Sequence, residues 1–202
     1  MGRVPERRYR ASGTIVEKAE GTLGFPVTTL CFEGPEDKVM AKRNAQPALV
    51  TYGAAVWATL GDRLRPHVRA AAGHSLGEFT AYHAAGAFVF PDALRLVRRR
   101  GELMFESGTK RPGAMAAILG LSEANVEAAC TRALEVGDVV PANYNTPEQL
   151  VISGEVAAVE AAMVIAKELG AKRTIRLNVS GAFHSPLMDE AAAGLKSALD
   201  AA

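Results

Sequence analysis

Cysteine is scarce in this chain, and the positions of the two cysteines exclude two classes of site. The 202 residues include only Cys31 and Cys130. They lie far apart and belong to no CxxC motif or Cys/His cluster, so the sequence indicates neither a disulfide framework nor a zinc site. A reducing cytoplasm is the expected location.

Net charge and long apolar runs are lacking as well. The formal net charge of +1 gives no electrostatic case for binding nucleic acid. The basic start contains no interleaved aromatic residues, and a solvated terminal helix or tail explains it at least as well; it comprises Arg3, Arg7, Arg8 and Arg10. No apolar run approaches the length that a bilayer span requires. We therefore expect a soluble protein that binds neither nucleic acid nor a membrane.

What the chain does contain is a serine between two glycines, in the sequence GHSLGE at residues 73–78. Gly-x-Ser-x-Gly is the nucleophile-elbow pattern, in which a tight turn between a strand and a helix exposes the serine hydroxyl. Residues 66–72 can form the strand, and residues 78–85 a helix that ends at Gly86. A side chain at either flanking glycine is expected to collide with its neighbours. Ser75 is therefore a candidate nucleophile, and a glycine-rich turn with an exposed serine is the alternative.

The first part of the chain is predicted to be mainly helical. Residues 14–60 contain breaks near 21–26 and 34–35, and Pro47 is expected to open the helix 48–60. This last helix is apolar almost all round, so we expect a core helix that packs on a sheet. Its apolar side chains are Leu49, Val50, Ala54, Val56, Trp57 and Leu60.

A different pattern begins at Pro112. Strands are predicted at 114–119, 139–143, 149–153 and 173–179, with helices at 122–134 and 156–169. The order strand, helix, strand, strand, helix, strand is that of a ferredoxin-like domain. With 49% hydrophobic residues the chain can bury a large core. The predicted class is α/β, with a small domain at 112–179 inserted into a larger one formed by 1–111 and 180–202.

A serine needs a base, and the chain has four histidines. His67 and His83 flank the elbow without a special setting, and His74 is expected to be a wall of the pocket. His184 lies in GAFHSP, at a second strand-to-helix junction. It can meet Ser75 if both lie at strand ends of one sheet. The alternative is a histidine that binds only local backbone.

That second junction has its own start signal for a helix. Ser185 can cap the helix that follows, and Pro186 can open it.

Arg100 falls on the apolar side of a helix predicted from Asp92 to about Phe105. The charged side chains project to the other side of that helix. An arginine that points into a core must meet an anion, because an unpaired buried charge is costly. Its partner could be a carboxylate of the protein or that of a substrate, and the helical wheel leaves both open.

The polar loop 143–149 could line a cleft or simply make a turn.

Six stretches, in order, resemble the malonyl-CoA:acyl carrier protein transacylases and the related acyltransferase domains of polyketide and fatty acid synthases. They are NAQPAL at 44–49, GHSLGE at 73–78, RG at 100–101, GAMAA at 113–117, NYN at 143–145 with Gln149, and 181–188. The resemblance implies an α/β-hydrolase-like large domain with the ferredoxin-like domain inserted.

The resemblance also implies roles for single residues. Ser75 would accept the malonyl group as an ester, His184 would be the base, and Arg100 would hold the malonyl carboxylate. The Leu76 N–H would be an oxyanion donor, and the ring of Phe183 would exclude an α-methyl branch. Two further positions, Gln46 and Asn145, match the family near the site.

The implied reaction is a ping-pong transfer in fatty acid biosynthesis. Malonyl-CoA would acylate the serine, and the phosphopantetheine thiol of acyl carrier protein would then take the malonyl group. No metal or resident cofactor is implied, and a monomer is expected. A serine hydrolase that uses the same elbow is the alternative enzyme, and an inactive fragment that binds acyl carrier protein is the alternative outside enzymes.

The sequence departs from the family pattern at both ends. The first strand and a glutamine-containing loop are missing, and so is the late segment that orients the histidine. The large domain is therefore expected to be incomplete at both ends. Either the chain is a fragment of a complete enzyme or it is a short protein with impaired activity.

Overall fold

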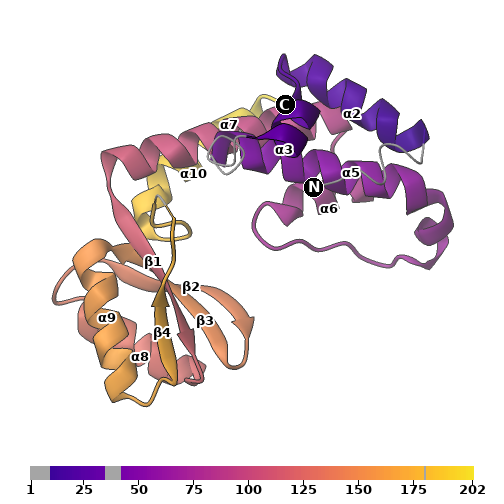
Figure 1. Cartoon of the computed structure of the whole chain (residues 1–202). Coiled ribbons are helices and arrows are strands. Elements are labelled where there is room, and N and C mark those ends of the chain that lie inside the picture. The colour runs from indigo at the N-terminus through magenta and orange to yellow at the C-terminus, as the bar shows by residue number, and fades with distance from the viewer. Residues whose placement is uncertain (1–9, 35–41, 180) are drawn as a thin grey trace. The chain divides into compact units, whose positions relative to one another are not determined.

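The computed structural model describes residues 10–34, 42–179 and 181–202 of this mixed α/β chain (Figure 1). The chain divides into two compact units. One comprises Met1–Glu102 and Ser197–Ala202, and the other comprises Leu103–Lys196. The predicted domain boundaries remain a prediction.

All regular secondary structure in the described part of the first unit is helical. Its helices are α2 (Arg10–Leu23), α3 (Val27–Glu33), α5 (Lys42–Leu64), the short 3-10 helix η1 (Arg65–His67), α6 (Gly77–Ala85) and the first part of α7 (Phe90–Lys110). The predicted break near 21–26 lies between α2 and α3. Gly86 ends α6 in the left-handed conformation, with φ 83°, as its position in the sequence predicts. The helix predicted at 92–105 is longer at both ends.

Helix α5 differs from its prediction in two ways. Pro47 lies inside the helix instead of opening it. The helix starts five residues before Pro47, so the proline ring removes one hydrogen bond from the second turn of α5. The helix is also not buried all round, since Val50 is fully buried whereas Leu49 is 44% and Leu60 38% exposed.

The strand predicted before the elbow is absent. Residues 65–67 form η1, and residues 68–73 have no regular secondary structure. Val68 is extended, with φ −80° and ψ 128°. An extended segment becomes a strand only when a neighbouring strand accepts and donates its hydrogen bonds, and the described part of this unit contains no other strand.

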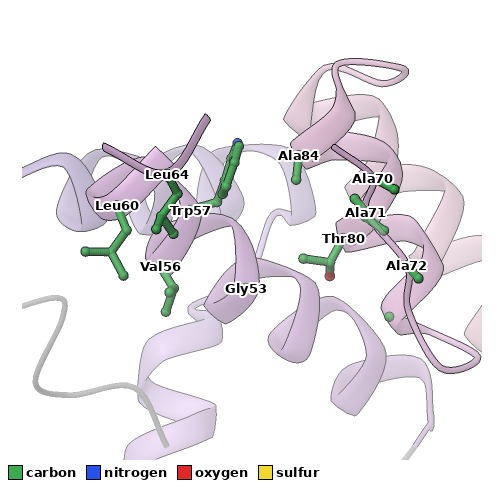
Figure 2. Close-up of a pocket in the computed structure, with 12 residues that line it drawn as sticks. Gly53, Val56, Trp57, Leu60, Leu64, Ala70, Ala71, Ala72, Thr80 and Ala84 are labelled. Atoms are coloured by element: carbon green, nitrogen blue, oxygen red, sulfur yellow. The ribbon is translucent and has the colours of Figure 1, made fainter. Parts of the chain in front are cut away.

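A cavity of about 390 Å³ lies between α5, α6 and the segment 70–72 (Figure 2). Helix α5 lines it with Val56, Trp57, Leu60 and Leu64, and α6 lines it with Thr80 and Ala84 among others. Most of these side chains are apolar. The first unit therefore contains a hydrophobic cavity whose lining also includes Gly77, at the first turn of α6.

The second unit is built on a four-stranded antiparallel sheet with the order β2-β3-β1-β4. Its elements follow the predicted order strand, helix, strand, strand, helix, strand. They are β1 (Gly113–Leu119), α8 (Glu123–Ala133), β2 (Val139–Thr146), β3 (Gln149–Glu155), α9 (Val156–Glu168) and β4 (Arg173–Arg176), followed by η2 (Pro186–Met188) and the first part of α10 (Asp189–Asp200).

The alternation of side chains along β1 divides the core of the second unit into two clusters. Ala116 and Ile118 belong to the cluster that includes residues of α8 and α9. Met115 and Ala117 belong to the other cluster, together with Phe183. Successive side chains of a strand point to opposite faces, so the sheet has an apolar layer on each face.

Two strand ends of the second unit differ from the prediction. β2 continues to Thr146, so the residues predicted as a polar loop are mostly strand, and only Pro147 and Glu148 separate β2 from β3. Asn145 lies at a shift of register between Tyr144 and Thr146, where the chain forms a bulge. β4 ends at Arg176 rather than Val179. Propensity alone does not reveal where strand pairing stops.

Candidate active site

Ser75 lies in a tight turn immediately before α6, with a positive φ of 52°. The amide of Gly77 donates to the carbonyl of His74 at 2.9 Å, and the amide of Glu78 donates to the carbonyl of Ser75 at 3.2 Å. Non-glycine residues rarely adopt this backbone conformation, and those that do cluster at functional sites. The turn and helix of the predicted elbow are therefore present, although the preceding strand is not.

The two glycines of the motif have different roles. A Cβ atom at Gly73 would overlap the backbone carbonyl group of Gly77 and the amide of Glu78. A Cβ atom at Gly77 would meet no atom within 4 Å. The expectation that both positions are sterically closed is therefore right for Gly73 and wrong for Gly77, because Gly77 faces the cavity beside α6.

Arg100 connects the elbow to helix α5. Its Nη2 donates to Ser75 Oγ at 3.0 Å, and its Nη1 donates to Gln46 Oε1 at 2.6 Å. Gln46 is only 4% exposed. Arg100 is half-buried, whereas its neighbour Arg99 is exposed, which agrees with the helical wheel. The site thus combines one side chain each from α5, the elbow and α7.

Both hydrogen-bond acceptors of Arg100 are uncharged. Burial lowers the pKa of Arg100, and the charge of Glu78 opposes that shift; the guanidinium stays protonated because its ordinary pKa is so high. Other arginines of α7 have carboxylate partners: Arg95 with Asp92 at 2.6 Å and Arg98 with Glu102 at 2.8 Å. Among the described residues, none forms such an ion pair with Arg100. The guanidinium charge is therefore available to an anionic ligand.

The geometry of the first unit combines a strained serine, a half-buried cation and a backbone turn at a helix N-terminus. The model of the acyl transferase domain family matches residues 7–202. This chain belongs to that family. The sequence-based resemblance is thereby confirmed.

Curated relatives of this chain include two bacterial transacylases. The malonyl CoA-acyl carrier protein transacylase of Bacillus subtilis is 44% identical over 203 residues, covering 100% of this chain and 63% of the relative. The protein of that name from Escherichia coli K12 is 42% identical over 189 residues, covering 90% and 60%. The chain thus spans about three fifths of the length of these relatives.

Solved structures of high similarity also match this chain. The acyl-carrier-protein-S-malonyltransferase of Bartonella henselae has a TM-score of 0.93 and 40% identity, covering 98% of this chain and 64% of its own. A second match is a malonyl-transacylase in complex with a type II PKS acyl-carrier protein. Its TM-score is 0.88 at 35% identity, covering 97% of this chain and 63% of its own.

The other histidines of the first unit have different surroundings. His83 Nδ1 is 3.2 Å from the Phe88 carbonyl oxygen, and the His83 ring lies 5.7 Å from that of Phe90. This histidine therefore anchors the turn between α6 and α7. His67 and His74 are both exposed. That His74 forms a wall of the pocket around Ser75 stays a prediction.

His184 belongs to the second unit and shares one feature with Ser75. Its φ is 61°, and these two are the non-glycine residues with positive φ in the described ranges. Ser185 caps η2 as predicted, because its Oγ accepts from the Leu187 amide at 3.3 Å and donates to the Ala182 carbonyl at 2.7 Å. β4 ends eight residues before His184, so the predicted strand-end position is wrong. The pairing of His184 with Ser75 stays a prediction.

The remaining candidate site residues occupy distinct settings. Phe183 is 5% exposed and packs with Met115 and Leu187. Asn145 is exposed at the bulge of β2. Within the first unit, the Leu76 amide donates no hydrogen bond to any described residue, which is the state required of an oxyanion donor.

In residues 10–34, 42–179 and 181–202, no three His, Cys, Asp or Glu side chains gather as potential metal ligands. No helix of the same ranges is both long and apolar enough to cross a membrane.

Sequence analysis did not identify the hydrogen bond between Gln46 and Arg100. One feature of the sequence indicates that Gln46 is buried. It lies in an apolar stretch of α5, beside Pro47 and Ala48, which are both buried. A buried amide requires a hydrogen-bond partner, and Arg100 was the inward-facing donor without one.

Proposed function

We propose that this acyl transferase carries a malonyl group from malonyl-CoA to the phosphopantetheine thiol of acyl carrier protein, through an ester on Ser75. The observation that carries the proposal is the contact of Arg100 with Ser75 Oγ at 3.0 Å. A cation beside the nucleophile selects an acyl group that has a carboxylate of its own. The names of the relatives support the same substrate.

The first half-reaction transfers the malonyl group to the enzyme. The imidazole of His184 takes the proton of the Ser75 hydroxyl, and Oγ attacks the thioester carbonyl of malonyl-CoA. The Leu76 N–H donates to the oxyanion that forms. The carbon–sulfur bond then breaks, and the CoA thiolate leaves with the proton from the imidazolium.

The second half-reaction reverses these steps with another thiol. His184 takes the proton of the phosphopantetheine thiol of acyl carrier protein, and the sulfur attacks the malonyl ester on Ser75. The ester bond breaks, and the serine oxygen recovers the proton. Transfer rather than hydrolysis requires that water be kept from the ester.

The surrounding residues determine which acyl group is accepted. The guanidinium of Arg100 binds the malonyl carboxylate through two parallel hydrogen bonds. The ring of Phe183 leaves little room for an α-methyl branch. His74 forms a wall of the pocket, and Gln46 and Asn145 lie near the bound acyl group.

The proposal extends to the architecture and the setting of the enzyme. The sheet order β2-β3-β1-β4 supports a ferredoxin-like domain at 112–179, inserted into an α/β-hydrolase-like domain. The enzyme would act in the cytoplasm in fatty acid biosynthesis, as a monomer, with acyl carrier protein as its partner and without a resident cofactor.

Removal of the Arg100 guanidinium tests the proposed substrate. Arg100→Ala should lower the rate of malonyl transfer by at least about 30-fold, because loss of one partner of a buried charge pair costs about 2–5 kcal/mol. Transfer of an uncharged acetyl group should change much less. The exposed neighbour provides the matched control, since Arg99→Ala should preserve both rates. An unchanged ratio of malonyl to acetyl transfer in Arg100→Ala would refute the proposal, and rapid release of free malonate by the unaltered chain would indicate a hydrolase.

A further inference from the structure

Arg100 is held by an amide at a position where a carboxylate of the same shape would fit. We propose that Gln46 is a positioning residue that determines specificity: its neutral side chain fixes the guanidinium beside Ser75 without neutralising it. The proposal deepens the function proposed above and rests on it, because it explains how the cation stays available to an acyl carboxylate.

Two hydrogen bonds orient the guanidinium of Arg100. Gln46 lies on α5, is 4% exposed, and accepts from Arg100 Nη1 at 2.6 Å. The other terminal nitrogen, Nη2, donates to Ser75 Oγ at 3.0 Å. The guanidinium is planar and rigid, so a hydrogen bond that holds Nη1 restricts where Nη2 can lie. Gln46 therefore determines where Arg100 points relative to the nucleophile.

The absence of charge on the Gln46 side chain leaves the positive charge of Arg100 without a counter-ion at this position. Glutamine and glutamate have the same length and present an acceptor oxygen at the same place, so geometry alone would permit either. A glutamate would form a buried ion pair with Arg100 and would then compete with any incoming carboxylate. Arg95 and Arg98 of the same helix already have carboxylate partners at 2.6 and 2.8 Å. Arg100 differs from them because both its acceptors are neutral.

Glu78 is the nearby carboxylate that could act as a counter-ion of Arg100. Glu78 is exposed in the first turn of α6 and raises the pKa of Arg100 through its charge. It forms no ion pair with Arg100 among the residues that the structure describes. Its carboxylate also suits the positive end of the α6 dipole. The guanidinium is thus stabilised at a distance while its own hydrogen bonds go to neutral groups.

The test compares two substitutions in the 202-residue chain. Gln46→Glu keeps the acceptor and adds a charge, whereas Gln46→Met removes the acceptor and keeps the neutral size. The binding probe is malonate, measured by calorimetry without turnover. The second readout is the rate of Ser75 acylation by malonyl-CoA relative to acetyl-CoA, followed by intact mass.

We expect Gln46→Glu to weaken malonate binding at least about tenfold and to lower the malonyl to acetyl ratio by a similar factor. Gln46→Met should weaken malonate binding less than Gln46→Glu does, yet slow acylation by malonyl-CoA, because Arg100 keeps its charge and loses its orientation. Circular dichroism and thermal unfolding establish that each variant is folded. If Gln46→Glu does not fold, Gln46→Met alone decides: wild-type acylation and wild-type malonate affinity in that variant would overturn the proposal.

Other results separate this inference from the proposed function. Wild-type malonate affinity in Gln46→Glu, an equal loss in both variants, or no malonate binding by the unaltered chain would overturn the role of Gln46. If the unaltered chain binds malonate in a Gln46-dependent way but Ser75 is never acylated by malonyl-CoA, then the proposed function fails and the role of Gln46 stands.

Discussion

Three side chains form the candidate site of the first unit, and each is held in place in a different way. The backbone turn holds Ser75 at φ 52°. Arg100 is half-buried, and this burial lowers its pKa. Gln46 is buried, and its amide oxygen accepts a hydrogen bond from the guanidinium at 2.6 Å. Inward placement of Arg100 could be predicted from the helical wheel. Its contact with Gln46 could not, because the two residues lie on separate helices and their approach depends on tertiary packing.

The elbow glycines give the first prediction at this scale. Gly73→Ala should destabilise the turn by about 1–3 kcal/mol and abolish acylation of Ser75, since the new methyl group would overlap the backbone at Gly77 and Glu78. Gly77→Ala is the matched control, because its Cβ atom meets no atom within 4 Å. Thermal unfolding and intact-mass measurement of acylation check both variants. Equal behaviour of the two variants would contradict this account of the turn.

At the scale of elements, the two units differ in how far local sequence determines them. In the second unit, the alternation along β1 and the apolar faces of α8 and α9 specify strands and helices locally. The predicted strand at 66–72 failed because strand pairing is non-local and the described part of that unit supplies no partner. The prediction that Pro47 opens a helix was wrong for a related reason. Proline usually marks a helix start, but here tertiary packing stabilises α5 on both sides of Pro47.

Helix capping provides a prediction for these elements. Ser185→Ala should destabilise the second unit by about 1 kcal/mol, because Ser185 Oγ both accepts from the Leu187 amide and donates to the Ala182 carbonyl. Ser122 precedes α8 without a side-chain capping bond. Ser122→Ala should therefore change stability by less than about 0.5 kcal/mol. Denaturant unfolding measures both, and a larger loss for Ser122→Ala would contradict the assignment.

At the scale of the whole molecule, each compact unit contains one cysteine. Cys31 lies in the first unit and is partly accessible, whereas Cys130 lies in the second and is buried. Burial raises the pKa of the Cys31 thiol, and burial together with Glu127 raises that of Cys130 to about 12. The two thiols therefore report separately on the integrity of the two units.

Alkylation kinetics test this difference. At pH 8 the Cys130 thiolate fraction is on the order of 10⁻⁴, so Cys130 should react far more slowly than Cys31. In concentrated guanidinium both thiols should react alike. Mass spectrometry of the alkylated peptides supplies the rates, and equal rates for Cys31 and Cys130 in the folded chain would disagree with the burial of Cys130.

The central claim is that Ser75 accepts a malonyl group from malonyl-CoA. Intact mass spectrometry of the 202-residue chain after mixing with malonyl-CoA, followed by peptide mapping, tests it most directly. The account predicts one malonyl adduct, located on Ser75, which is absent from Ser75→Ala and is removed on addition of phosphopantetheinylated acyl carrier protein. An adduct at another residue, or no adduct on a folded chain, would contradict it.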